Sequence, residues 1–239
     1  MVDSAGGPQL LEAAMPELLS SGHVDRVRCV AGDAIFAEGD RDTCLYVIEK
    51  GRVRVGRHNG TDRECLFTVL GPGEMFGEES VFDPGPRSSC AIAMTDVDAV
   101  CLQRAGLIPL LTARPEMAQR FLRIMARRIR STSSNITDTV YADVAARVAK
   151  HLLGLAQRFG VQDDGAMRVP MDLTQEQFAH LVGSSRESVN KVLCDFASRG
   201  WIAVGRDTIM IRESEPLATR MHGARRPGRI TQRPHLAAG

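Results

Sequence analysis

The spacing of apolar residues changes along the chain. Between residues 24 and 102, short runs such as CLYVIEKGRVRVGRH alternate apolar and polar positions, and glycines separate the runs. Such runs with glycine at the turns are typical of an antiparallel barrel or jelly roll. Beyond residue 115, apolar residues recur every three or four positions, as on one face of a helix. We therefore expect an α+β fold in which an N-terminal antiparallel β-roll or jelly roll precedes a mainly helical region.

The longest helical pattern covers residues 115–139. Within it, apolar and small residues alternate at spacings of three and four, namely Leu122, Met125, Ile129, Thr132, Ile136 and Thr139. Such a heptad stripe is typical of a coiled coil, so we expect a dimerisation helix over residues 115–140. Its interface is expected at Leu122, Met125, Ile129, Thr132 and Ile136. The alternative is a helix that packs on its own domain, but the stripe is narrow and arginines flank it.

Residues 174–196, TQEQFAHLVGSSRESVNKVLCDF, contain two short helical stripes separated by a turn at Gly183. Thr174 and Gln177 have the spacing of a capping box at the start of the first helix. Ser184 or Ser185 can cap the second helix. Two capped helices joined by a short glycine turn predict a helix-turn-helix.

The second helix of this unit presents Arg186, Glu187, Asn190 and Lys191 on the face opposite its apolar stripe. Arginine can donate two hydrogen bonds to guanine, and glutamate can accept one from cytosine. An ordinary solvated face is the alternative, but the turn, the caps and the residue types together favour DNA binding. The residues expected to contact double-stranded DNA are Thr174, Gln175, Ser185, Arg186, Glu187, Asn190 and Lys191.

The segments around the helix-turn-helix complete a winged domain, expected over residues 141–214. Asp143 is the expected N-cap of a helix that runs to Phe159, and a loop at residues 162–165 leads to a short strand. The segment WIAVGRDTIMIR predicts a β-hairpin, the wing. Residues 215–239 are basic and rich in proline, and we expect them to be a disordered tail.

Composition narrows the class of protein. The chain has 239 residues, a hydrophobic fraction of 44% and a net charge of +1, which suits two globular domains and local, not general, attraction to DNA. A short amphipathic helix is expected over residues 9–20. Because no apolar run could span a membrane and no signal peptide is visible, we expect a cytoplasmic protein without a membrane partner.

The six cysteines show neither a C-x-x-C pair nor the spacing of a metal site, so no metal is expected. We expect free, buried thiols. A redox-sensing thiol is the alternative.

The loop GEMFGEESVFDPGPRSSC, residues 73–90, is the expected ligand site of the β-roll, which we place within residues 1–114. Gly77 allows a ligand to approach the backbone, and the carboxylate of Glu78 can accept hydrogen bonds from a sugar. Arg87, followed by Ser88 and Ser89, suits a phosphodiester. Ordinary turn chemistry with a surface ion pair is the alternative for this loop.

The sequence resembles the CRP/FNR family of bacterial transcription regulators, in the branch of the cyclic-AMP receptor protein. The resemblance covers residues 24 to 212 and rests on FGEES...PGPRSS, MARRIRSTS, YADVAARVAKHLL and LVGSSRESVNKVL, in the family's order. The branch with an iron–sulfur cluster holds it with clustered N-terminal cysteines, and no cysteine precedes Cys29 here. The resemblance therefore implies a cyclic-nucleotide-binding β-roll, a dimerisation helix and a winged helix-turn-helix.

Residue roles follow from the resemblance. Arg87 and Ser88 would bind the cyclic phosphate, Gly77 and Glu78 the ribose, and Thr132 and Ser133 the adenine, one of these two from the partner subunit. Arg186, Glu187 and Lys191 match the family's base-reading positions. Glu79 departs from the family, whose members carry a bulky apolar residue there. A carboxylate facing the pocket would oppose an anionic ligand.

These inferences predict a homodimeric, sequence-specific DNA-binding transcription regulator with cyclic AMP as effector, a roughly palindromic operator and a hinge at Asp143. RNA polymerase is an expected partner, through the loop at residues 162–165. One alternative keeps DNA binding but makes the roll ligand-independent or thiol-responsive. A cyclic-nucleotide-regulated enzyme ranks last, because the pocket loop lacks a nucleophile–base pair and the winged domain leaves no room for a catalytic domain. We therefore expect no enzyme activity.

Overall fold

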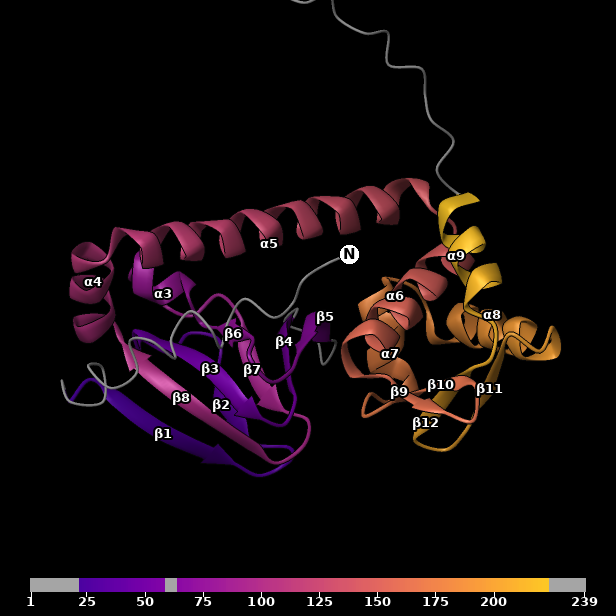
Figure 1. Ribbon diagram of the computed structural model, residues 1–239, viewed down its shortest axis with the longest axis horizontal. Coiled ribbons are helices and arrows are strands. Elements are labelled where there is room, and N and C mark those ends of the chain that lie inside the picture. Colours follow the sequence, from indigo (N-terminus) through magenta and orange to yellow (C-terminus); the bar gives the residue numbers. More distant parts are fainter. Residues whose placement is uncertain (1–21, 59–63, 224–239) are drawn as a thin grey trace, which may run out of the picture.

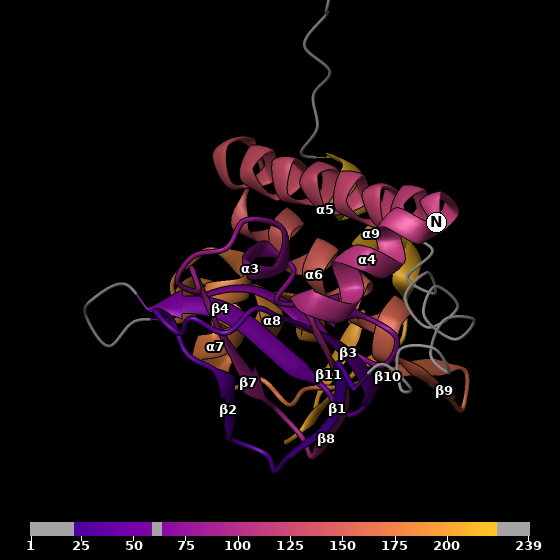
Figure 2. The same cartoon turned by 90° about the vertical axis from the view of Figure 1, so that its left-hand side faces the viewer.

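The computed structural model describes residues 22–58 and 64–223 (Figure 1). A β-roll and a helical domain lie side by side, and one long helix, α5 (Pro115–Tyr141), passes over both. Figure 2, turned by 90°, shows the roll in front of the helical domain with α5 above them. The helix expected over residues 9–20 lies outside the described residues.

The roll consists of two antiparallel four-stranded sheets, in the orders β1-β8-β3-β6 and β2-β7-β4-β5. The strands of the roll are β1 (Val24–Cys29), β2 (Ala34–Phe36), β3 (Cys44–Lys50), β4 (Val53–His58), β5 (Glu64–Leu70), β6 (Met75–Phe76), β7 (Cys90–Ala93) and β8 (Val97–Gln103). The expected antiparallel β-roll is thus confirmed. The alternating strands predicted it because only one face of each sheet can be buried in a two-sheet roll.

Aromatic rings occupy the centre of the roll. The rings of Tyr46 and Phe76 stack with centroids 5.2 Å apart, and Phe36 lies 5.9 Å from each of them. All three residues are buried with Ile48 and Val53 in one apolar cluster. This cluster fixes the strand ends around the loop that follows β6.

Helix α3 (Glu79–Phe82) lies between β6 and β7 of the roll, and helix α4 (Arg104–Ala113) connects β8 to α5. The start of α5 packs on the roll through the buried Met117 and Phe121, which share an apolar cluster with Leu107 of α4. Farther along α5, Leu122, Ile129 and Ile136 are 67%, 67% and 62% exposed. The helix therefore covers its own domain with one face and presents a second, apolar face to solvent.

The second domain is a winged helix-turn-helix, as expected. It consists of α6 (Val144–Phe159), β9 (Val161–Asp163), β10 (Ala166–Pro170), α7 (Gln175–Val182), α8 (Arg186–Ser198), β11 (Ile202–Val204), β12 (Thr208–Ile211) and α9 (Ser214–Gly223). Its sheet has the order β11-β12-β10-β9. Buried Leu152, Phe178 and Phe196 join the three central helices in one core.

Helix α9 corrects the expectation of a disordered tail from residue 215. Its Leu217 is completely buried in the core of the winged domain, and α9 packs on α6. Its Arg220 forms an ion pair of 2.6 Å with Asp143. Composition suggested disorder because residues 215–239 are basic and rich in proline, and one buried leucine gives no helical pattern. The expectation for residues 224–239 lies outside the described residues.

The two domains share an interface. Leu66 and Val69 of β5 belong to the same buried cluster as the helices of the winged domain. Arg158 of α6 pairs with Glu74 of the roll and lies over the ring of Phe159, 4.8 Å from its centroid. The ring of Phe159 also lies against Gly71, where an added Cβ would be 2.5 Å from it. The roll and the DNA-binding domain are therefore in direct apolar and ionic contact.

Candidate functional site

Two hydrogen bonds fix the backbone of Arg87, independently of the contacts of its side chain. Its N–H donates to the carbonyl of Asp40 at 2.8 Å, and its carbonyl accepts from the N–H of Gly39 at 2.9 Å. These bonds fasten the segment before β7 to the loop between β2 and β3. The side chain consequently points inward, and the residue is only 4% exposed.

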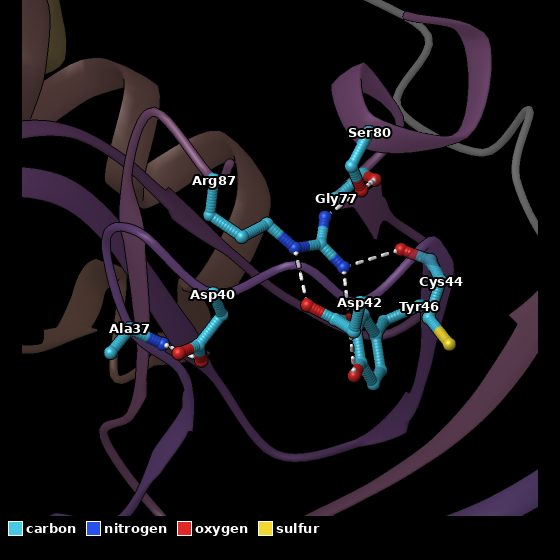
Figure 3. A network of polar contacts seen from close by, with 8 residues as sticks. All are labelled: Ala37, Asp40, Asp42, Cys44, Tyr46, Gly77, Ser80 and Arg87. Atoms are coloured by element: carbon cyan, nitrogen blue, oxygen red, sulfur yellow. Dashed lines mark hydrogen bonds and ion pairs between the residues drawn. The ribbon is translucent and has the colours of Figure 1, made fainter. Parts of the chain in front are cut away.

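The guanidinium of Arg87 is surrounded by acceptors (Figure 3). Its Nε and Nη2 donate to the two carboxylate oxygens of Asp42 at 2.9 and 2.5 Å. Its Nη1 donates to the carbonyl of Gly77 at 2.7 Å, and Nη2 also donates to the carbonyl of Cys44 at 2.8 Å. The ring of Phe36 lies 4.1 Å from the guanidinium carbon. These bonds and the ring hold the cation in one orientation.

Gly77 forms the opposite wall of this site. Its φ angle is +82°, a left-handed conformation that favours glycine. A Cβ at this position would lie 2.7 Å from Nη1 of Arg87 and 2.9 Å from the carbonyl oxygen of Cys44. The absence of a side chain is therefore a steric requirement of the guanidinium site.

The two glutamates after Gly77 have different partners. The carboxylate of Glu78 pairs with Arg128 of α5, whose guanidinium also donates to the carbonyl of Met75. The carboxylate of Glu79 accepts a hydrogen bond from the hydroxyl of Ser88. Glu79, which departs from the family, thus faces a side chain expected to bind phosphate, although the residue is itself exposed.

Asp42 was missed by sequence reasoning. It lies 45 residues before Arg87 in the chain, in a loop with several polar residues, so no local spacing marks it as the partner. Burial would raise the pKa of its carboxyl, but the hydrogen bonds and charge of Arg87 outweigh burial and hold the pKa below its usual value. Asp42 is therefore ionised at neutral pH and neutralises the guanidinium.

The remaining residues expected at the ligand site lie around this centre. Ser89 is half-buried directly after Ser88, at the entry to β7. Thr132 and Ser133 are exposed on α5, one turn beyond Arg128. The structure thus brings Gly77, Arg87 and the paired Glu79 and Ser88 together in the roll, and it places the two hydroxyl residues on the long helix.

The helix-turn-helix has the local chemistry that the sequence predicted. Thr174 and Gln177 form both hydrogen bonds of the capping box at α7. Gly183 ends α7 in the left-handed conformation, with φ of +70°, and Ser185 caps α8 by accepting from the N–H of Ser188 at 3.2 Å. Of the two candidate caps, Ser185 is the one used.

A polar surface spans the starts of α7 and α8. The side-chain oxygen of Gln175 accepts from Nε and Nη2 of Arg186 at 3.2 and 3.1 Å, and from Asn190 at 3.4 Å. Thr174, Glu187 and Lys191 are exposed beside them. Gln175 therefore orients Arg186 and joins the start of α7 to Arg186 and Asn190 of α8, while the other residues expected to meet DNA are exposed on or next to the same two helices.

The hinge between α5 and α6 is hydrogen-bonded on both sides. Asp143 accepts from the N–H of Ala146 at 2.8 Å, which confirms the predicted cap. Arg147 donates to the carbonyl of Ala142 at 2.7 Å, and to those of Val182 and Gly183 at 3.0 and 3.1 Å. One guanidinium thus bonds both to the end of α5 and to the turn of the helix-turn-helix.

The described residues were expected to hold no metal site and no membrane-spanning helix, and their cysteines were expected to be buried. No group of three or more His, Cys, Asp or Glu side chains suited to a metal ion occurs among residues 22–58 and 64–223. Along the same part of the chain, each helix is too short or too polar to cross a lipid bilayer. Cys65 and Cys194 are exposed, so the expectation of buried thiols is wrong for these two residues.

Fold and site together define a two-domain regulator in which a ligand-binding β-roll is joined by a long helix to a DNA-binding winged helix. Residues 26–114 match the cyclic nucleotide-binding domain, and residues 146–220 match the Crp-like helix-turn-helix domain. The chain belongs to the CRP/FNR family of DNA-binding transcription regulators, which are not enzymes.

Two relatives cover most of the chain. A CRP-like cAMP-activated global transcriptional regulator from Mycobacterium tuberculosis is 51% identical over 189 residues, which are 79% of this chain and 84% of the relative. The cyclic AMP receptor protein of Thermus thermophilus is 31% identical over 210 residues, which are 87% of this chain and 94% of the relative. A solved CRP-family transcriptional regulator from Thermus thermophilus superposes with a TM-score of 0.70 at 26% identity, covering 82% of this chain and 96% of the other.

Proposed function

We propose that the protein is a homodimeric transcription regulator whose affinity for its operator is controlled by cyclic AMP bound in the β-roll. The observation that carries this proposal is the buried guanidinium of Arg87, which lies against the backbone of Gly77. A fixed cation beside a glycine, with hydroxyls at Ser88 and Ser89, suits the phosphodiester of a cyclic nucleotide. The names of the relatives from Mycobacterium tuberculosis and Thermus thermophilus support cyclic AMP as the nucleotide.

The proposed ligand competes with two internal pairs and adds a contact to a third. Its phosphate competes with Asp42 for Arg87 and with Glu79 for Ser88. Its ribose hydroxyl is an additional donor to Glu78, which pairs with Arg128 in the structure. Because Arg128 belongs to α5, a change at Glu78 acts directly on the long helix. A ligand shifts the conformational balance only by its unequal affinity for the two states.

The proposed dimer is built by the exposed apolar stripe of α5. Leu122, Ile129 and Ile136 follow one another at intervals of seven residues, which is the repeat of a coiled coil. Met125 is partly buried against the cluster of its own roll, so it links the stripe to the roll. Thr132 and Ser133 lie on the same segment, and we assign them to the adenine, with one supplied by the partner subunit.

DNA recognition is assigned to the surface formed by Gln175, Arg186, Glu187, Asn190 and Lys191, with Thr174 and Ser185 at the helix starts. Two such surfaces in a dimer fit successive major grooves about 34 Å apart, so the operator is roughly palindromic. We assign contact with RNA polymerase to residues 162–165, all four of which are exposed. The first two of them belong to the end of β9, not to the loop expected there, and the last two form the turn that follows it.

Calorimetry with cyclic AMP and retention of a DNA library test this function together. The wild-type protein should bind the nucleotide and then retain DNA more strongly, whereas Arg87→Leu should lose nucleotide binding. Because Arg87 has a structural role in the roll, Ser88→Ala provides a milder test, with weaker nucleotide binding expected in a folded protein. Equal affinity in all three proteins would overturn the assignment. DNA binding unaffected by the nucleotide would favour the ligand-independent alternative.

A further inference from the structure

We propose that Cys44 and Cys101 form an oxidation-sensitive dithiol in the β-roll, which a peroxide converts to a disulfide next to the Arg87 site. Formation of the disulfide is independent of the proposed function. Only its effect on nucleotide binding rests on that function.

The two cysteines lie on adjacent strands and on one face of the sheet. In the register of β3 and β8, Cys44 pairs with Gln103 and Tyr46 pairs with Cys101. Cys44 and Cys101 are therefore diagonal neighbours, two positions apart, and both pack in the apolar cluster that contains Tyr46 and Phe36. Each thiol lies near enough to the other to change its pKa. The pair is thus placed for reaction by the fold.

The two thiols differ in accessibility and acidity. Cys101 is 6% exposed, whereas Cys44 is only partly buried at the first position of β3. The neighbouring Cys101 thiol lowers the pKa of Cys44, and the charge of Arg87 acts in the same direction, against burial, Asp42 and Asp25. The neighbouring Cys44 thiol and burial raise the pKa of Cys101. Cys44 is therefore the nucleophile and Cys101 the resolving thiol.

The reaction needs one equivalent of peroxide. The thiolate of Cys44 attacks one oxygen of hydrogen peroxide, the O–O bond breaks, and the products are a sulfenic acid and hydroxide, which takes a proton to become water. The sulfur of Cys101 then attacks the sulfenic sulfur of Cys44, and the S–O bond breaks. The proton of the Cys101 thiol joins the departing hydroxide, which leaves as a second water. Two thiols are oxidised by two electrons, and the peroxide is reduced by the same two.

Closing the disulfide affects Arg87 through the backbone of Cys44. Figure 3 shows the carbonyl of Cys44 directed to the guanidinium while its sulfur lies on the other side. Diagonal neighbours in a sheet have Cα atoms about 7–8 Å apart, whereas disulfides hold them at about 4.4–6.8 Å. The first residue of β3 must therefore move toward β8, and the acceptor carbonyl of Arg87 moves with it.

Peptide mapping tests the dithiol directly. The reduced full-length chain is treated with one equivalent of hydrogen peroxide, alkylated, digested without reductant and analysed by mass spectrometry. A peptide that links Cys44 to Cys101, and disappears after reduction, is expected. Cys44→Ser and Cys101→Ser should each lose it, while the matched control Cys65→Ser, at an exposed thiol, should keep it. Oxidation confined to Cys65 and Cys194 would overturn the proposal.

Cyclic AMP titration of the same samples measures the consequence. Oxidised wild-type protein should bind the nucleotide about fivefold or more weakly, because a charge-assisted hydrogen bond is displaced, and reductant should restore the affinity. Cys101→Ala should bind equally well before and after peroxide. A cross-link without loss of affinity would overturn the coupling to Arg87. Failure of reduced protein to bind cyclic AMP, with the cross-link intact, would instead count against the proposed function alone.

Discussion

The carboxylate of Asp42 and the guanidinium of Arg87 form a bidentate pair, with N–O distances of 2.9 and 2.5 Å, inside the β-roll. Arg87 is buried, whereas the side chain of Asp42 is 33% exposed. The cation expected to bind a phosphate is thus neutralised by an anion of the same chain. Asp42 both orients Arg87 and competes with an incoming phosphate, and these two effects can be separated by substitution.

Asp42→Asn should tighten cyclic AMP binding by about three- to tenfold, equal to about 1 kcal/mol, because it removes the competing charge but keeps an acceptor for Arg87. It should also lower the free energy of unfolding by about 1–2 kcal/mol, since a charged hydrogen bond becomes a neutral one. Calorimetry and urea unfolding measure the two effects. Asp40→Asn, in the same loop but bonded to the N–H of Ala37 and not to the guanidinium, is the control and should leave the affinity for cyclic AMP unchanged.

Leu122→Glu should convert the proposed dimer to a monomer at micromolar concentration, because Leu122 is 67% exposed in the single chain and lies on the proposed coiled-coil stripe. Sedimentation velocity measures the change. The matched control is Ser131→Glu, which adds the same charge to α5. It lies two residues beyond Ile129, so it is about 200° around the helix from the stripe. Equal dissociation in both variants, or dimers in both, would count against this interface.

Arg186→Ala should weaken binding to the preferred operator by about 1–3 kcal/mol per half-site and leave binding to unrelated DNA nearly unchanged. Arg186 lies at the start of α8, where Gln175 orients it. Gel retardation on matched and scrambled DNA separates the two affinities. Arg199→Ala, at the other end of α8 and paired with Asp195, is the control and should keep the preference. A preference retained by both variants would show that α8 does not read bases.

His151 of α6 should make the protein less stable in mild acid. Burial, followed by the charge of Lys150, lowers the pKa of His151 from 6.5 to about 4. Between these pH values the unfolded chain binds a proton that the folded chain excludes, so the free energy of unfolding falls as the pH drops. The loss is at most about 3 kcal/mol at 1.36 kcal/mol per pH unit.

Urea unfolding of wild type and His151→Leu between pH 4 and pH 7 checks this expectation. The variant should lose that part of the pH dependence, while His58→Gln, at an exposed histidine of β4, should keep it. Parallel pH curves for wild type and His151→Leu would refute the assignment.

The elements that the sequence predicted well are those whose signals are local. The capping box of Thr174 and Gln177 and the cap at Asp143 each depend on residues three positions apart. In the strands, likewise, the alternation of apolar and polar residues indicates by itself which face is buried. Helix α9 depends instead on the burial of Leu217 against α6, and no periodicity in a basic, proline-containing segment reveals that contact.

For two of the three ion or hydrogen-bonded pairs at the site, only one side was predictable. Both members of the Glu79–Ser88 pair lie in one short loop that the sequence marked. Arg87 and Glu78 lie in the same loop, but their partners Asp42 and Arg128 are 45 and 50 residues away from them. Such partners follow from the folding of distant strands and of α5 onto the roll. Sequence reasoning therefore found the groups that suit a ligand, and the structure shows which groups of the chain already occupy them.

Arg147 has a mechanical consequence for the whole molecule. Its planar guanidinium bonds to the last carbonyl before the hinge and to two carbonyls at the end of α7. The final turn of α5 and the end of α7 are therefore joined through a single side chain, so a rotation of one must either carry the other with it or break these hydrogen bonds.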